Sequence, residues 1–124
     1  MLQALIVEDN DVFGKFIKET LVSKTSGILY SQARTCREAR ERFEEFSPRL
    51  VLMDLRLPDG SGLQLIKEFK QRCPEAVVIV LTSYDLLEYR SAALDNGATH
   101  FLVKGAVTGE ELSSLVNSVA FQIV

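Results

Sequence analysis

The chain has 124 residues, of which 47% are hydrophobic and 25% are charged, and its net charge is -3. This composition is typical of one globular domain with a buried core, and it excludes a disordered or fibrous chain. The acidic balance gives no indication of a general affinity for nucleic acids or for anionic membranes.

Three features indicate the cellular setting. Cys36 and Cys73 are isolated and lack C-x-x-C spacing, so we expect structural thiols in a reduced, intracellular environment. The N-terminus lacks a basic n-region and reaches an acidic residue at Glu8, too soon for a signal peptide. No apolar run approaches the ~20 residues that a membrane span needs. We therefore expect a cytoplasmic protein without a membrane partner.

Short apolar runs alternate along the chain with segments of helical periodicity. The strand-like runs are Leu2–Val7, Ile28–Ala33, Leu50–Asp54, Ala76–Thr82 and Thr99–Val103. Five βα units of this kind predict a doubly wound α/β domain, with a parallel sheet between two layers of helices, over residues 1–124.

Four helix starts carry a capping signal. Thr35 with Glu38 and Thr108 with Glu111 match the capping box, Ser61 with Gln64 matches its glutamine form, and Asp85 with Glu88 is a weaker match. Apolar stripes predict the buried face of each helix except the fourth, whose stripe is the vaguest. The predicted stripe residues are Phe13, Phe16, Ile17 and Leu21; Ala39, Phe43 and Phe46; Leu65, Ile66 and Phe69; and Leu112, Leu115, Val116 and Val119.

Polar residues stand where four of the predicted strands end. They are Glu8 and Asp9, Asp54, Thr82 and Lys104. The carboxyl ends of parallel strands meet at one edge of the sheet, where ligands bind. Three carboxylates at that edge repel one another unless a cation lies among them, which predicts a divalent-metal site with Asp54 placed for chemistry.

Each of these polar residues also has a simpler explanation. Glu8 and Asp9 could cap the first helix, as Asn10 or Asp11 could, and Thr82 could be a helix cap. Lys104 could simply neutralise the carboxylates through a salt bridge, which is compatible with a role in chemistry.

Four motifs in order carry a family resemblance: Val7–Asn10, Leu52–Gly62, Leu81–Ser83 and Phe101–Lys104. Over essentially its whole length the chain resembles the receiver domain of two-component response regulators. The resemblance implies a (βα)5 flavodoxin-like fold with strand order 2-1-3-4-5. It also implies a phosphorylation-dependent switch that assists its own phosphorylation and dephosphorylation without being a conventional enzyme.

The resemblance assigns roles to the residues at the strand ends. Asp54 would accept a phosphoryl group from a sensor histidine kinase or a phosphotransfer protein, with Mg²⁺ or Mn²⁺ as cofactor. The metal would be bound directly by Asp9, Asp54 and the main-chain carbonyl of Arg56, and through water by Glu8. Lys104 and Thr82 would each contact a phosphoryl oxygen.

The resemblance also implies how the signal leaves the site. Thr82 would move toward the phosphoryl group and Phe101 would turn inward behind it, although ordinary core packing explains Phe101 equally well. The fourth helix, fifth strand and fifth helix would then meet an unknown effector or a second copy of the chain, and Leu86 or Leu87 would mark a contact patch there if exposed. No direct contact with nucleic acid is expected of this domain.

Lys104 is followed by Gly105, where many receivers have proline, so we expect a trans peptide bond. This ending resembles receivers that precede a helix-turn-helix domain, which favours transcriptional output in a longer protein. A stand-alone receiver and an excised domain both remain open.

Arg56 and Tyr84 each lie two residues after a site residue, at the predicted mouth of the site. By the family pattern these positions influence the access of water to the phosphoryl group, so a long Arg and a bulky Tyr predict slow autodephosphorylation. The alternative is that both side chains point into solvent and matter little.

Three other functions fit less well. A flavodoxin-like nucleotide carrier needs a phosphate loop rich in Gly, Ser or Thr after the first strand, whereas Glu8–Asp11 would repel phosphate. An aspartyl-phosphate phosphatase needs an Asp-x-Asp pair, and Arg56 takes the place of the second acid. A degenerate receiver acting only as an adaptor predicts the loss of a site residue, and none is lost.

Overall fold

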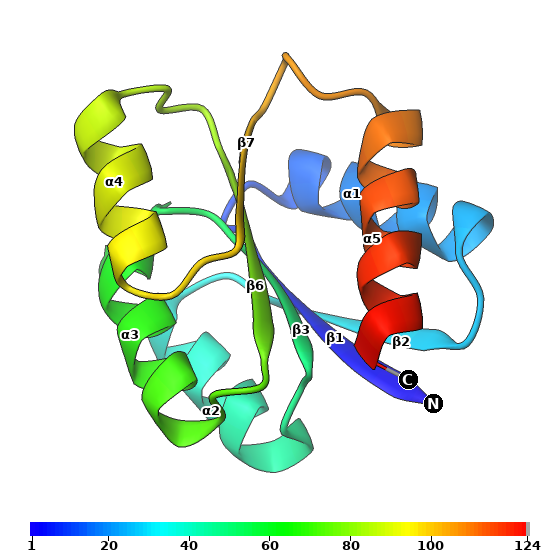
Figure 1. The fold of residues 1–124 in the computed structure, drawn as a ribbon, viewed down its shortest axis with the longest axis horizontal. Coiled ribbons are helices and arrows are strands. Elements are labelled where there is room, and N and C mark those ends of the chain that lie inside the picture. Colours follow the sequence, from blue (N-terminus) through cyan, green and yellow to red (C-terminus); the bar gives the residue numbers. More distant parts are fainter. Residues whose placement is uncertain (124) are drawn as a thin grey trace.

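Five parallel strands form the centre of the computed structural model, which describes residues 1–123, and helices cover both faces of the sheet (Figure 1). The strands of the sheet are β1 (Leu2–Val7), β2 (Ile28–Ala33), β3 (Leu50–Met53), β6 (Val77–Thr82) and β7 (His100–Val103). The helices are α1 (Asp11–Lys24), α2 (Cys36–Phe46), α3 (Gly62–Arg72), α4 (Leu87–Asp95) and α5 (Gly109–Ile123). A short antiparallel hairpin, β4 (Arg56–Leu57) with β5 (Gly60–Ser61), follows β3.

The order of strands in the sheet is β2-β1-β3-β6-β7. This confirms the predicted order 2-1-3-4-5. The fourth and fifth strands of the sheet are labelled β6 and β7 because the hairpin strands β4 and β5, which were not predicted, come before them in the chain. All neighbouring pairs are parallel. The carboxyl ends of β1, β3, β6 and β7 therefore lie at one edge, as the site requires.

The hydrophobic core has one part on each face of the sheet. Helices α1 and α5 cover one face and α2, α3 and α4 cover the other (Figure 1). All four residues of β3 are buried: Val51 and Met53 pack toward α2 and α3, and Leu50 and Leu52 pack toward α1 and α5. A central strand that is apolar on both sides is what a doubly covered parallel sheet needs.

The predicted apolar stripes are confirmed for most of their members. Two are wrong: the Phe16 and Phe46 side chains are 57% and 40% exposed. Phe16 lies about 100° around α1 from the buried Ile17, outside the narrow strip that faces the sheet. Phe46 is the last residue of α2, and the chain turns away at Ser47, which adopts a left-handed conformation. Leu115 and Phe13 are only partly buried.

The four predicted caps differ in how far the structure confirms them. At α5, Thr108 and Glu111 exchange hydrogen bonds in a complete capping box. Thr35 accepts the N–H of Glu38 as predicted, but the Glu38 carboxylate accepts the N–H of Arg34 instead of that of Thr35. The capping-box prediction is thus confirmed in full at α5 and in half at α2.

At α3, Ser61 accepts the N–H of Leu63 and not that of Gln64. The cap predicted at Asp85 is wrong, because α4 begins after Leu86, which makes no side-chain cap hydrogen bond. Within residues 1–123, no helix has the length and apolar character needed to cross a bilayer.

The stacked pair Phe43–Phe69, with ring centroids 4.1 Å apart, joins α2 to α3 in the buried core. Replacing Phe69 by Ala leaves a cavity beneath both helices, so we expect the free energy of unfolding to fall by about 3–5 kcal/mol. Phe46→Ala removes the same ring from an exposed position of α2 and should cost less than about 1 kcal/mol. Urea unfolding of both variants provides the comparison, and equal losses would contradict the described core.

Candidate functional site

The sheet ladder continues past the ends of the strands and thereby places the polar residues. The Asp54 N–H donates to the Val7 carbonyl at 3.0 Å, and the Lys104 N–H donates to the Thr82 carbonyl at 2.8 Å. The Glu8 N–H donates to the Ala33 carbonyl at 2.9 Å in the same way. The residues that follow the strands are therefore held by the backbone of their neighbours.

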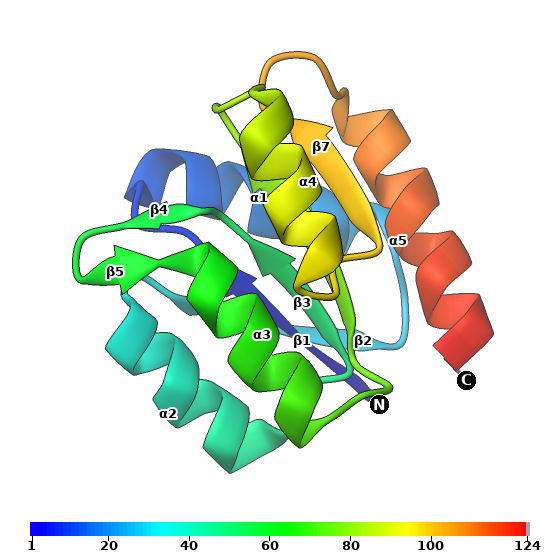
Figure 2. The ribbon, with the colours of Figure 1, turned by 60° about the vertical axis from the view of Figure 1, so that its left-hand side comes forward.

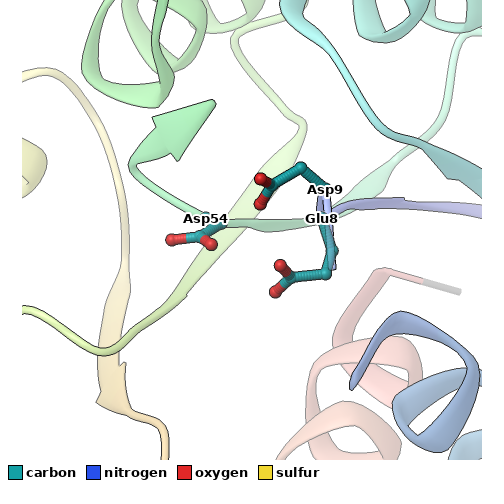
Figure 3. A group of neighbouring side chains, drawn as sticks. All are labelled: Glu8, Asp9 and Asp54. Carbon is teal, nitrogen blue, oxygen red and sulfur yellow. The ribbon is translucent and has the colours of Figure 1, made fainter. Parts of the chain in front are cut away.

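The carboxylates predicted to share one edge of the sheet do lie together. One oxygen from each of Glu8, Asp9 and Asp54 lies within 4.8 Å of the others, and Figure 3 shows the three side chains converging from two strand ends. Glu8 and Asp54 are buried and Asp9 is exposed. They line a cavity of about 370 Å³ together with Arg56, Tyr84 and Lys104. Clustered carboxylate oxygens with one solvent-facing member fit a hard divalent cation such as Mg²⁺.

Lys104 joins the two buried carboxylates. Its Nζ lies 2.6 Å from Glu8 Oε1 and 3.1 Å from Asp54 Oδ2. Burial raises the pKa of Glu8, and the hydrogen bond from Lys104 only partly offsets that effect. Burial alone would lower the pKa of Lys104, but its contacts with Glu8 and Asp54 outweigh burial and raise this pKa. Lys104 is therefore a charged partner of both acids, as its simpler explanation required.

The Asp54 side chain is fixed in one orientation. Its Oδ2 contacts Lys104, and its Oδ1 accepts the N–H of Leu55 at 2.8 Å. A Cβ at Gly62 would lie 2.2 Å from the Asp54 carbonyl oxygen, so the start of α3 can approach Asp54 only because residue 62 is glycine. Both carboxylate oxygens are thus held at the floor of the cavity.

Neither Glu8 nor Thr82 acts as the cap of the helix that follows it. The cap of α1 is Asn10, whose side chain accepts the Phe13 N–H at 2.9 Å, while Glu8 accepts the N–H of Asn10 at 3.1 Å. Thr82 is buried and does not cap α4, since that helix begins five residues later at Leu87. The hydroxyl of Thr82 accepts only a long hydrogen bond, 3.4 Å, from the Tyr84 N–H.

Arg56 and Tyr84 contact each other at the mouth of the cavity. The guanidinium carbon of Arg56 lies 4.6 Å from the centroid of the Tyr84 ring, and Tyr84 packs edge-on against Tyr89 with centroids 6.0 Å apart. A hydrogen bond to Tyr84 raises the pKa of Arg56. The two side chains therefore contact each other, and both line the cavity; Arg56 is exposed and Tyr84 is half-buried.

Phe101 is buried in the core beside α4, and the Arg90 guanidinium carbon lies 4.7 Å from its ring centroid. Core packing thus describes Phe101 in this structure. Leu86 and Leu87 are exposed, Leu87 by 74%. Both therefore have the exposure that a contact patch at this position would need. The Lys104–Gly105 peptide bond is trans, as predicted.

Two contributors to the site were not predicted from the sequence. The ring of Phe13 lies under Lys104, with its centroid 4.5 Å from Nζ, a cation–π contact that no sequence pattern indicates. The β4–β5 hairpin was missed because its strands have only two residues each. The Pro58-Asp59-Gly60 turn signal was its one available indication.

Lys104→Met should lower the free energy of unfolding by about 3 kcal/mol in the absence of divalent cations, because it leaves two buried carboxylates unpaired. The deficit should shrink as pH falls toward the ordinary carboxyl range, since a raised folded-state pKa at Glu8 favours folding when that group is protonated. Denaturant unfolding across pH tests this. Asp54→Asn in the same background should recover part of the loss, and no recovery would contradict the described charge balance.

Comparisons with known proteins agree with this geometry. Residues 4–117 match the model of the response regulator receiver domain family. The DNA-binding transcriptional activator DevR/DosR of Mycobacterium tuberculosis is 29% identical over 96% of this chain and 54% of its own length. The photosynthetic apparatus regulatory protein RegA of Cereibacter sphaeroides is 30% identical over 90% of this chain and 60% of its own length. The chain thus spans little more than half of either relative.

Solved structures show the same fold. A CheY-like response regulator receiver domain protein from Methanospirillum hungatei superposes with a TM-score of 0.91 at 25% identity, over 99% of this chain and 96% of the other. The signal receiver domain of a putative Luxo repressor protein from Vibrio parahaemolyticus gives a TM-score of 0.89 at 24% identity, over 98% and 92% of the two chains. With the family model covering most of its length, this chain belongs to the response regulator receiver domains of two-component signalling.

Proposed function

We propose that this domain is a phosphorylation-dependent switch in which Asp54 accepts a phosphoryl group from a sensor histidine kinase or a phosphotransfer protein. The observation that carries the proposal is the cluster of Glu8, Asp9 and Asp54, with Lys104 bridging its two buried members. Receiver domains typically bind Mg²⁺ at such an acidic cluster.

In the proposed reaction a carboxylate oxygen of Asp54 attacks the phosphorus of a phosphohistidine. The new O–P bond forms as the N–P bond breaks, and the imidazole leaves with the bonding electron pair. Asp9, Asp54 and the Arg56 carbonyl would hold Mg²⁺ or Mn²⁺ directly, and Glu8 would hold it through water. The cation, when bound, would compensate the negative charge of the transferring group.

Lys104 and Thr82 would respond to the product. Lys104, already in contact with Asp54, would exchange a carboxylate oxygen for a phosphoryl oxygen. The Thr82 hydroxyl, which makes only one long hydrogen bond, is free to donate to another phosphoryl oxygen. The domain would thus assist a stoichiometric transfer to and from itself without acting on a separate substrate.

The proposed output surface comprises α4, β7 and α5. Movement of Thr82 would change the packing behind it, where Phe101 of β7 packs against Arg90 of α4. Exposed Leu86 and Leu87 offer an apolar contact area for an effector or for a second copy of the domain. The relative DevR/DosR, named as a DNA-binding transcriptional activator, supports a transcriptional effector in a longer protein, although no direct contact of this domain with nucleic acid is proposed.

The direct test is the intact mass of the protein after incubation with a small-molecule phosphodonor. We expect one added phosphoryl group in the wild type with Mg²⁺, none when a chelator removes the metal, and none in Asp54→Asn. Asp85→Asn, at an exposed acid near the site, is the control and should be phosphorylated normally. Modification of Asp54→Asn would contradict Asp54 as the acceptor, and absence of both adduct and Mg²⁺ binding would favour an adaptor.

The contact between Arg56 and Tyr84 predicts a long-lived phosphoryl group, because two bulky side chains in contact line the cavity that attacking water must enter. We expect Arg56→Ala and Tyr84→Ala each to accelerate phosphate loss several-fold, with the double variant close to the faster single one because the two side chains act together. Release of phosphate from the purified phosphoprotein measures this, and equal lifetimes in all variants would remove the shielding role.

A further inference from the structure

The tip of the β4–β5 hairpin contacts the N-terminus of α2 (Figure 2). Asp59 Oδ1 accepts the Cys36 N–H at 2.7 Å, and Asp59 Oδ2 accepts the Arg37 N–H at 3.1 Å. These are the first two N–H groups of the helix, which have no acceptor within it. Thr35 accepts the third, from Glu38, at 3.0 Å. Asp59 therefore caps a helix from a segment more than twenty residues away.

This contact is close and favourable in charge. A Cβ at Gly60 would lie 3.2 Å from the Sγ of the buried Cys36, so little space separates the hairpin from the helix. The hydrogen bond from the Cys36 N–H lowers the pKa of Asp59, and an ionised carboxylate at a helix N-terminus is favoured by the helix dipole. The tip of the hairpin is thus clamped to α2.

The other end of the hairpin is attached beside Asp54. The Gly62 N–H donates to the Leu55 carbonyl at 2.9 Å, and Arg56 pairs with Ser61 in the hairpin itself. Arg56 therefore lies between two points of attachment, the base next to Asp54 and the tip at Asp59. The Arg56 side chain is exposed, and its aromatic contact is with Tyr84, outside the hairpin.

We infer that Asp59 is a positioning residue for the metal site: its clamp on α2 sets the position of the Arg56 carbonyl. This inference rests on the proposed function, in which that carbonyl is a metal ligand. The carbonyl is the one proposed protein ligand that comes from the hairpin backbone, whereas Asp9 and Asp54 follow strands of the large sheet. Contacts that orient a ligand without touching the metal contribute substantially to affinity.

Calorimetric titration of Mg²⁺ into the folded domain tests the inference without requiring phosphorylation. Asp59→Ala should weaken Mg²⁺ binding by about tenfold. Asp59→Asn keeps one acceptor oxygen and should show a smaller loss, which also provides a milder variant if the alanine protein folds poorly. Thr35→Ala is the matched control, because it removes a cap from the same helix end without touching the hairpin. It should lower stability and leave Mg²⁺ affinity unchanged.

An unchanged Mg²⁺ affinity in both Asp59 variants, or an equal loss in Thr35→Ala, would overturn the inference. Repeating the Mg²⁺ titration at high salt separates a positional effect of Asp59 from an electrostatic one. At about 1 M salt the Debye length falls to about 3 Å, so a purely electrostatic effect of Asp59 should vanish, whereas a positional effect should persist; disappearance would overturn the inference. A wild type that binds no Mg²⁺ would overturn the proposed metal site itself, whereas normal wild-type binding with unaffected variants would overturn only the role of Asp59.

Discussion

The ion pairs of Lys104 with Glu8 and Asp54 are the contacts on which the site depends. Lys104 follows the edge strand β7, whereas Glu8 follows β1, three strands away in the sheet. Their contact at 2.6 Å therefore ties the edge strand β7 to β1 at the point where the polar residues gather. Two buried carboxylates would strongly destabilise the fold without this cation, because each would lose hydration without gaining a partner of opposite charge. Three carboxylates share one lysine at this edge, and the remaining negative charge favours binding of a divalent cation.

The surroundings of the site differ in how firmly they are held. The floor is rigidly built: β3 is buried along its length, and Asp54 is fixed through both carboxylate oxygens. On the other side, α4 buries only Ala93 and has no side-chain cap at its start. A helix with few buried contacts belongs to the part of a fold that rearranges at low cost. Arg90 of α4 packs on the Phe101 ring. The contrast is consistent with the proposed switch, in which Asp54 stays in place while α4 and Phe101 move.

Much of the fold and of the site's placement follows from the sequence, for identifiable reasons. Buried parallel strands are continuous apolar runs, so the end of β3 at Asp54 and the end of β1 at Glu8 could be predicted together with the edge that they share. Contacts between segments could not be predicted in this way. The exposure of Phe16 depends on where α1 lies against the sheet, and the clamp between Asp59 and α2 depends on the path of a hairpin too short to show periodicity. The cap prediction was correct at Thr108, where the signal is local. It was wrong at Asp85, because the chain stays extended as far as Leu86.

The central claim is that the carboxylates at the ends of β1 and β3 form one cation site around Asp54, beside Lys104. Titration of Mg²⁺ followed by backbone amide NMR tests it most directly, because it reports each segment separately. The amides after β1, after β3 and near Lys104 should shift together, saturate at one Mg²⁺ per chain and give one common affinity, and Asp9→Asn should weaken all three responses alike. Unsaturable shifts scattered over the acidic surface, or different affinities for the three segments, would contradict a single shared site.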